Sequence, residues 1–220
     1  MSQQTIHRLP QAVIFDWDNT LVENWQILTD SVNAALAAFN LPLWNTEQMV
    51  ANSKRSMRDS FPEIFGPDWH RARDIFYTHF RTYHLQGLKE LTHAKELLNF
   101  LQQHGVKLMV CSNKNGDLLR REVAYLNWSH YFSDVVGATD AEKDKPDPAP
   151  AHLLLKRNNL KPHEHVWFVG DTISDMICGT QSGCFTVGIG KDSLENPEFQ
   201  PGLWVYDLAE LLTALKLLLS

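Results

Sequence analysis

Three features are scarce in this sequence of 220 residues, and each scarcity argues against a class of protein. Cysteine occurs only at Cys111, Cys178 and Cys184, within or beside apolar runs and without metal-ligand spacing, which suggests small hydrophobic side chains in a reducing compartment. Positive charge is not in excess, since the formal net charge is −6, so nucleic acid is not expected as a partner. No apolar run is long enough for a membrane span, and the first residues lack the apolar core of a signal peptide. We therefore expect a cytoplasmic protein without a membrane partner.

The features that are present are typical of a folded α/β protein. Hydrophobic residues make up 44% of the chain and charged residues 21%, close to the globular average. Apolar, β-branched runs recur, each followed by a helical pattern, at residues 12–15, 106–111, 134–136, 166–169 and 184–189. This alternation predicts a doubly wound, mainly parallel sheet with helices on both faces, a Rossmann-like α/β core. Asp207, with Glu210 in the following turn, predicts the start of a last helix.

A second domain is predicted between the first two strands. About ninety residues separate these strands, far more than a simple crossover needs. Apolar residues recur at helical spacing in two parts of this segment, residues 27–39 and 69–83. We therefore predict that residues 22–88 form a small inserted α-helical cap, and that residues 1–21 and 89–220 form the core.

Pairs of carboxylates follow the first and the fourth predicted strands. Asp16 and Asp18 end the first strand, and because side chains alternate along an extended chain, both point to one side while Trp17 points to the other. Asp171 and Asp175 follow the fourth strand, one helical turn apart. Such oxygen ligands suit Mg²⁺, which commonly takes one or two protein carboxylates together with phosphate and water oxygens. Taken singly, each pair is also consistent with turn and helix-cap chemistry.

Two further segments carry groups that suit a phosphate. Ser112, Asn113 and Lys114 offer a hydroxyl, an amide and a cation at the start of a predicted helix, where backbone N–H groups favour anions. Ser112 as an ordinary helix N-cap is an equally good interpretation. Lys145 precedes Pro146-Asp147-Pro148, a stiff turn that would hold its ammonium in place, although an isolated lysine is more often a surface residue.

The four segments together are more informative than any one of them alone. In open parallel sheets, ligands bind beyond the C-terminal ends of the strands where the strand order reverses. Three of the four segments fall at such ends. Two carboxylate pairs, a hydroxyl and a fixed lysine therefore predict a divalent-metal site for phosphoryl transfer.

The four segments also resemble the motifs of the haloacid dehalogenase superfamily, and they occur in the same order. They read Phe-Asp-Trp-Asp-Asn-Thr-Leu, Cys-Ser-Asn-Lys, Lys-Pro-Asp-Pro and Val-Gly-Asp-Thr-Ile-Ser-Asp-Met.

Two other features look most like the phosphoglycolate phosphatase branch of that superfamily. One is Gly137-Ala138-Thr139-Asp140 before the lysine motif, and the other is the helical insert after the first motif. Two positions depart from the usual pattern: Asn19 stands where glycine is commoner, and Thr92-His93 stands where Pro-Gly is usual.

The resemblance implies a phosphatase that hydrolyses a small phosphorylated metabolite, a phosphoglycolate-like monoester, through an aspartyl-phosphate. It implies that Asp16 is the nucleophile and Asp18 the general acid and base. Ser112 and Lys145 would bind the phosphoryl group, with Asn113 as a further donor.

The resemblance also implies Mg²⁺ as the cofactor. Asp171 would hold the ion, with a carboxylate oxygen of Asp16 and the backbone carbonyl of Asp18. Asp175 would support the water molecules of the metal.

The predicted cap contains a basic stretch with Lys54, Arg55 and Arg58. These residues are candidates for binding a second anionic group of the substrate while the cap acts as a lid. A solvated basic patch is an equally good interpretation.

Several other functions remain open at this point. A phosphomutase uses the same groups but returns the phosphoryl group to a sugar. A haloacid dehalogenase needs neither a second aspartate nor a metal, so Asp18 argues against it. A phospho-accepting signalling domain also joins a doubly wound sheet to a strand-end aspartate and Mg²⁺, but Asp18 and the insert argue against it. A non-catalytic binding protein also stays open, although every expected reacting group is in place. The sequence does not indicate an oligomeric state.

Overall fold

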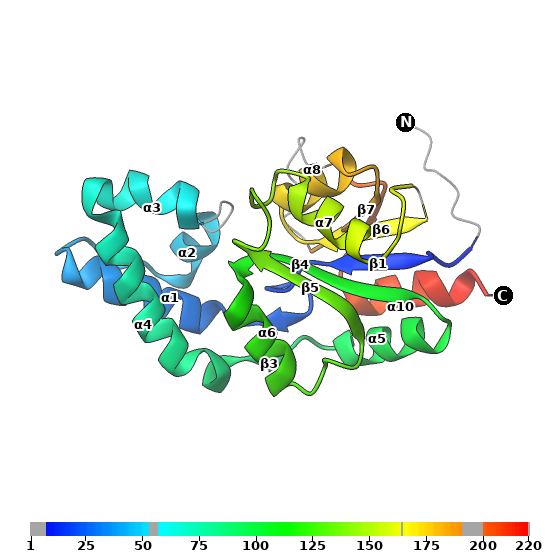
Figure 1. Cartoon of the computed structure of the whole chain (residues 1–220). Coiled ribbons are helices and arrows are strands. Elements are labelled where there is room, and N and C mark those ends of the chain that lie inside the picture. Colours follow the sequence, from blue (N-terminus) through cyan, green and yellow to red (C-terminus); the bar gives the residue numbers. More distant parts are fainter. Residues whose placement is uncertain (1–7, 53–56, 164, 191–199, 220) are drawn as a thin grey trace. The chain divides into compact units, whose positions relative to one another are not determined.

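The computed structural model describes residues 8–52, 57–163, 165–190 and 200–219 (Figure 1). The chain divides into two compact units. The core unit comprises Met1–Val22 and Glu90–Ser220, and the inserted unit comprises Glu23–Lys89. No helix in the described ranges combines the length and the apolarity that a membrane crossing requires.

A six-stranded sheet forms the centre of the core unit, and all of its neighbouring strands are parallel. The strands lie in the order β5-β4-β1-β6-β7-β8. Their bounds are β1 (Ala12–Phe15), β4 (Lys107–Asn115), β5 (Phe132–Ala138), β6 (Val166–Gly170), β7 (Phe185–Ile189) and β8 (Leu203–Val205). The chain moves outward from β1 through β4 and β5 and then returns to β6 on the other side of β1. The strand order therefore reverses at β1, where parallel sheets bind ligands.

Helices connect these strands and cover both faces of the sheet (Figure 1). The helices α7 and α8 lie on one face, and α5, α6 and α10 lie on the other. Their bounds are α5 (Ala94–Gln103), α6 (Gly116–Tyr125), α7 (Ala149–Arg157), α8 (Ile173–Gln181) and α10 (Leu208–Leu217). The predicted doubly wound, mainly parallel α/β core is confirmed.

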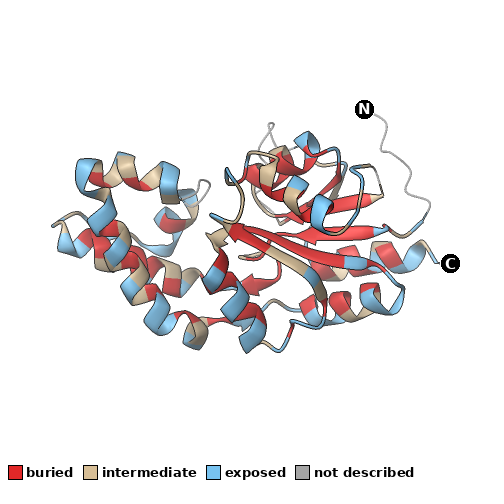
Figure 2. Ribbon diagram, viewed as in Figure 1, coloured by how far each residue is buried: buried red, intermediate tan, exposed pale blue. Residues whose placement is uncertain are grey.

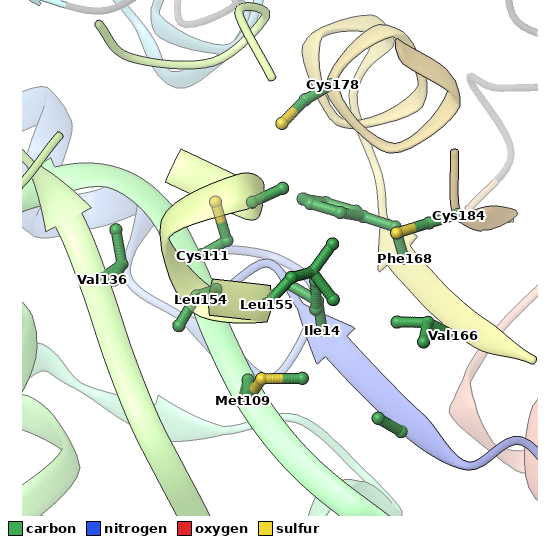
Figure 3. Close-up of a cluster of buried hydrophobic side chains, with 12 residues drawn as sticks. Ile14, Met109, Cys111, Val136, Leu154, Leu155, Val166, Phe168, Cys178 and Cys184 are labelled. Carbon is green, nitrogen blue, oxygen red and sulfur yellow. The ribbon is translucent and has the colours of Figure 1, made fainter. Parts of the chain in front are cut away.

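Burial on both faces explains why the strands read as unbroken apolar runs. Ile14 of β1 packs with Phe168 of β6 in a cluster that α7 and α8 cover (Figure 3). The intervening residues Val13 and Phe15, which point to the other face, are buried as well. Figure 2 shows the central strands as almost wholly buried. Parallel strands covered on both sides have this pattern because neither face meets water.

The observed elements differ from the predicted ones mainly at their ends. The strand predicted to end at Cys111 continues to Asn115, and β8 was not predicted. The last helix begins as expected, because Asp207 Oδ1 accepts a hydrogen bond from the Glu210 backbone N–H at 2.9 Å.

The inserted unit is helical and has its own aromatic core. The rings of Phe61, Phe65, Phe76 and Phe80 are buried in it and contact one another. Its elements are α1 (Trp25–Ala38), α2 (Thr46–Asn52), α3 (Met57–Phe65), the 3₁₀ helix η1 (Gly66–Asp68) and α4 (Trp69–Gly87).

A short ribbon lies where the chain leaves and re-enters the core unit. The strands β2 (Val22–Glu23) and β3 (Lys89–Glu90) form a separate two-stranded sheet. Beside it, the Leu91 backbone N–H donates to the Leu21 carbonyl at 3.0 Å. The two flanks of the insertion are therefore fixed to each other within the core unit.

Candidate active site

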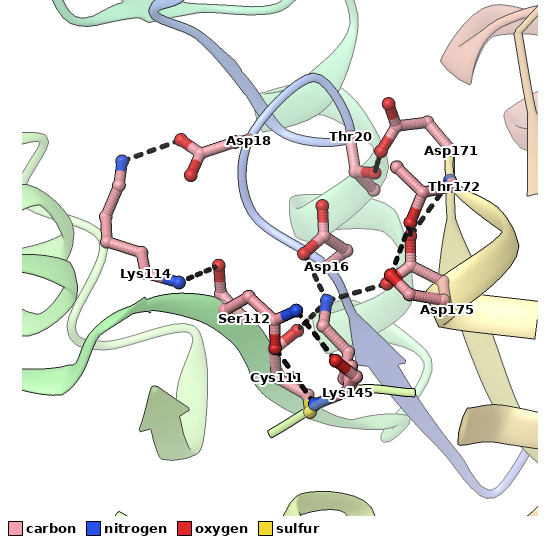
Figure 4. Close-up of polar contacts among 12 residues, drawn as sticks. Asp16, Asp18, Thr20, Cys111, Ser112, Lys114, Lys145, Asp171, Thr172 and Asp175 are labelled. Carbon is pink, nitrogen blue, oxygen red and sulfur yellow. Dashed lines mark hydrogen bonds and ion pairs between the residues drawn. The ribbon is translucent and has the colours of Figure 1, made fainter. Parts of the chain in front are cut away.

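The predicted site residues of the core unit gather around the C-terminal ends of the central strands (Figure 4). Asp16 follows β1, Ser112 lies in β4 and Asp171 follows β6. Lys145 comes from the connection between β5 and α7. Because β1 has β4 and β6 as its neighbours, the parallel sheet brings these distant segments to one edge.

Lys145 lies at the centre of this group. Its ammonium donates to Asp16 Oδ1 at 2.6 Å, to Asp175 Oδ1 at 2.6 Å and to the Cys111 carbonyl at 2.9 Å. The lysine side chain is only 3% exposed. Three acceptors match the three donors of an ammonium, so the charge is held at a defined position and is not a surface charge.

The side chain of Asn113 holds the Lys145 segment in place. Its Nδ2 donates to the Lys145 carbonyl and its Oδ1 accepts from the Lys145 backbone N–H, both at 2.9 Å. The Lys145–Pro146 peptide bond is cis. The amide predicted to contact the substrate is thus engaged with the backbone of the lysine that it positions.

Three carboxylates surround the same point and fit a divalent cation. Asp16, Asp171 and Asp175 each offer one oxygen, and these atoms all lie within 4.8 Å of one another. Thr20 Oγ1 donates to Asp171 Oδ1 at 3.2 Å, while Thr172 donates to Asp175 Oδ2 through its backbone N–H at 2.9 Å and its hydroxyl at 2.6 Å. Carboxylate oxygens that are buried or half-buried and held by hydrogen bonds are ligands that a hard cation prefers.

The electrostatics of this trio also favour a cation. Burial raises the pKa of Asp16 to about 7, against the opposing effect of Lys145. Burial, followed by repulsion from Asp16 and Asp175, raises the pKa of Asp171 well above its usual range. Burial alone would lower the pKa of Lys145, but Asp16 and Asp175 outweigh it and raise that pKa well above its ordinary value. One ammonium therefore faces three acids, which an added divalent cation would stabilise as carboxylates.

Asp18 takes part in a separate set of contacts. Lys114 Nζ donates to Asp18 Oδ1 at 2.6 Å and to Glu122 Oε2 at 2.6 Å. Burial opposes the charge of Lys114, but Asp18 and Glu122 raise the pKa of this lysine above its ordinary value. The next residue, Asn19, has a φ of +61°, a left-handed conformation that asparagine adopts more readily than most residues. The two aspartates of the first motif are thus held by two different lysines.

Ser112 is buried and lies inside a strand. Its Oγ accepts a hydrogen bond from the Lys114 backbone N–H at 3.2 Å. The helix α6 begins at Gly116, and its N-cap is Asn115, whose side chain accepts from the Leu118 backbone N–H at 3.4 Å. The alternative that Ser112 caps this helix is therefore wrong, because β4 continues past it by pairing with β5.

Sequence reasoning missed Glu122. This residue is fully buried on α6, where its neighbours on the same face are Leu118, Leu119 and Val123. A charged residue within an apolar helical stripe was the signal that could have identified it, because such a group is rarely buried without a partner.

The basic residues that were predicted to bind substrate belong to the inserted unit. Lys54 and Arg55 lie outside the described residues. Arg58 is an exposed residue of α3 in the inserted unit.

Comparisons with known proteins agree with these motifs. Residues 13–189 match the family model described as haloacid dehalogenase-like hydrolase. The chain is 30% identical over 221 residues to a phosphoglycolate phosphatase of Haemophilus influenzae, with 91% of this chain and 96% of that protein covered. It is 23% identical over 206 residues to pyrophosphatase PpaX of Oceanobacillus iheyensis, with 92% and 95% covered.

A solved structure shares the fold. The crystal structure of a predicted phosphoglycolate phosphatase from Haemophilus somnus superimposes with a TM-score of 0.81 at 22% identity, over 93% of this chain and 97% of that one. Because the family model spans most of the sequence and the Haemophilus influenzae relative is similar along nearly its whole length, the chain belongs to the haloacid dehalogenase-like hydrolases.

Proposed function

We propose that the chain is a magnesium-dependent phosphatase that hydrolyses a small, phosphoglycolate-like monoester through an aspartyl-phosphate on Asp16. Its family and its phosphatase-named relatives make it a phosphoric monoester hydrolase. The proposal adds to this activity the Mg²⁺ ion, the aspartyl-phosphate intermediate and the phosphoglycolate-like substrate. The observation that carries it is the position of Lys145, whose ammonium lies 2.6 Å from both Asp16 and Asp175 at the edge of the sheet.

The proposed reaction has two displacements. A carboxylate oxygen of Asp16 attacks phosphorus, the bond from phosphorus to the leaving oxygen breaks, and Asp18 protonates that oxygen. Water then attacks the aspartyl-phosphate while Asp18 takes up its proton, and Asp16 is released as a carboxylate. Lys145 and the hydroxyl of Ser112 bind phosphoryl oxygens and disperse their charge. Because its side chain holds Lys145, Asn113 would contribute its backbone N–H to this group.

The cation of the proposal is Mg²⁺. Asp16, Asp171 and Asp175 would hold it, together with the backbone carbonyl of Asp18. When bound, Mg²⁺ would neutralise charge on the phosphoryl oxygens and on the nucleophile.

The substrate is proposed from the relatives and from the insert. Similarity to the Haemophilus influenzae enzyme favours a phosphoglycolate-like compound, while similarity to pyrophosphatase PpaX makes inorganic pyrophosphate the second candidate. We propose that residues 22–88 act as a cap, and that Lys54, Arg55 and Arg58 bind the second anionic group of the substrate. The three buried, unpaired thiols agree with a cytoplasmic location, which is part of the same proposal.

A panel of phosphorylated metabolites and pyrophosphate, assayed at fixed Mg²⁺, tests the substrate. We expect the highest kcat/KM for a small carboxylate-bearing monoester, and release of phosphate from p-nitrophenyl phosphate that EDTA abolishes. Preference for pyrophosphate would replace the first candidate by the second. Isomerisation of a sugar phosphate with a bisphosphate activator would instead identify a phosphomutase.

Rapid-quench mass spectrometry tests the intermediate. We expect a phosphoryl adduct on Asp16 during turnover, and loss of both the adduct and the activity in Asp16→Asn. The matched control is Asp117→Asn, because Asp117 is an exposed carboxylate of α6 outside the acidic trio. If isotopically labelled water shows direct attack on the substrate, or if Asp16→Asn retains full activity, the proposed mechanism is wrong.

A further inference from the structure

Four polar side chains near the end of β1 are connected by hydrogen bonds, in a chain of contacts that ends at Asp18. The Trp17 indole Nε1 donates to Glu122 Oε2 at 2.7 Å, and the same Glu122 oxygen accepts from Lys114 Nζ at 2.6 Å. Lys114 in turn donates to Asp18 Oδ1 at 2.6 Å. All four residues belong to the core unit. In Figure 4, the pair formed by Lys114 and Asp18 lies apart from the cluster around Lys145.

Stability alone does not explain why the charged side chains in this chain of contacts are buried. The side chains of Glu122 and Lys114 are 0% and 4% exposed, whereas that of Asp18 is 21% exposed. Removing two charges from water is unfavourable, and an apolar pair of similar volume often stabilises a protein as well or better. The leucines beside Glu122 on α6 indicate that this face accommodates apolar side chains.

The geometry instead immobilises Lys114. Its backbone N–H binds Ser112 Oγ at 3.2 Å, so the start of its side chain is fixed at the strand. Its ammonium lies at the end of a flexible four-carbon stem, which has many conformations in a free lysine. Glu122 and Asp18 both accept hydrogen bonds from that ammonium, each at 2.6 Å, and so restrict it. The position of Glu122 is in turn restricted by the Trp17 indole.

We propose that Glu122 is a positioning residue, which fixes the Lys114 ammonium so that Lys114 holds the Asp18 carboxyl group in the orientation that proton transfer to the leaving oxygen requires. The inference rests on the proposed phosphatase function and deepens it, because it identifies the residues that orient Asp18, the proposed general acid. General acid catalysis requires hydrogen-bond reach to the proton acceptor, so a rotated carboxyl group loses most of its effect.

Leaving groups of different basicity test this role. An alkoxide needs a proton as it leaves, whereas 2,4-dinitrophenolate does not. Misplacement of Asp18 therefore lowers kcat/KM, which reports the first displacement, only for the ester with the alkoxide leaving group. We expect Glu122→Gln to lower kcat/KM for an alkyl phosphate about tenfold, and the double variant Lys114→Met/Glu122→Gln to lower it about a hundredfold. For 2,4-dinitrophenyl phosphate, both variants should stay within about threefold of the unaltered protein. Glutamine keeps an oxygen that accepts from the Trp17 indole.

The double variant separates positioning from stability. It removes both buried charges, so its melting temperature should remain within a few degrees of that of the unaltered protein. Glu142→Gln, at an exposed position of the core unit, is the matched control and should leave both substrates unaffected.

Equal losses for the two substrates would show a general structural role and overturn the inference, as would an unchanged alkyl phosphatase activity in the double variant. Failure of the proposed function is a different result, because the unaltered protein would then hydrolyse neither phosphate ester.

Discussion

Replacement of Lys145 by methionine should reveal how strongly the acidic trio depends on this single cation. Methionine has a similar length and no charge, so Lys145→Met removes the ammonium while it fills most of the same space. Asp16 and Asp175 each lose a hydrogen bond of 2.6 Å, and the Cys111 carbonyl loses one of 2.9 Å. The carboxylates remain buried without a compensating charge.

The expected loss in the free energy of unfolding follows from these contacts. Breaking a buried ion pair by removal of one partner costs about 3–5 kcal/mol, because the other charge stays desolvated. The loss depends on pH, because burial and mutual repulsion raise the pKa values of Asp16 and Asp171 against the opposing effect of Lys145, and removal of the lysine lets both values rise further in the folded protein. The folded variant therefore binds more protons than the folded unaltered protein, and its free energy of unfolding falls more steeply as pH rises from about 4 to about 7 and beyond.

Urea unfolding of the metal-free protein at about pH 5 and about pH 8 measures this effect. We expect the full loss at the higher pH and a smaller loss at the lower one. Mg²⁺ at about 100 times its Kd should restore about 2.7 kcal/mol. The matched control is Lys143→Met, because Lys143 is 67% exposed and its pair with Asp147 should contribute no more than about 1 kcal/mol.

A variant as stable as the unaltered protein at the higher pH, without Mg²⁺, would refute the reasoning. So would a loss that is the same at both pH values, because protonation of the carboxylates would then not relieve the repulsion.

Three further predictions concern the same edge of the sheet. Because burial raises the pKa of Asp16 to about 7 and that of Asp171 well above its usual range, calorimetry should find that Mg²⁺ binding weakens by at least about tenfold per pH unit below about pH 7, as one or more protons are displaced. Asn113→Ala should lower the free energy of unfolding by about 1–3 kcal/mol and lower kcat, because it leaves the Lys145 backbone without two hydrogen bonds of 2.9 Å. Gly137→Ala should destabilise the protein by about 1–3 kcal/mol in thermal unfolding, because the new Cβ would lie 2.5 Å from the Gly116 Cα.

Each of these predictions has a clear contrary result. Mg²⁺ affinity that does not change between about pH 5 and about pH 8 would mean that no proton is displaced. Unaltered stability of Asn113→Ala would mean that water or another group replaces the amide. An unchanged melting temperature of Gly137→Ala would mean that β5 moves away from α6 without loss.

The positions of the strands were predictable from the sequence, and so was the meeting of the four motifs at one edge of the sheet, because both depend on local sequence pattern. Each buried strand is a short apolar run between polar segments, and the parallel arrangement brings strand ends to one edge whatever lies between them. The start of the last helix was predictable for the same reason, because the Asp207 side chain accepts a hydrogen bond from the Glu210 backbone N–H, only one turn along the chain.

The polar extension of β4 was not predictable from local pattern. Residues 112–115 are polar and have little tendency to form a strand, but Asn115 pairs with Ala138 of β5. Pairing with a neighbour decides strand formation more than intrinsic preference does. The roles of Lys114 and Glu122 were missed for a related reason, because their contact joins the end of β4 to the buried face of α6.

The hydrogen bond from the Leu91 backbone N–H to the Leu21 carbonyl joins the two flanks of the insertion directly. Both flanks are anchored to one another independently of the residues between them, so the register of the sheet does not depend on the length of the intervening chain. Closing a flexible segment twice as long costs only about 0.6 kcal/mol more. One core unit of this kind can therefore carry insertions of different sizes. In the proposed cap role, exchange of the insertion would change substrate preference while the residues of the candidate site stay in place.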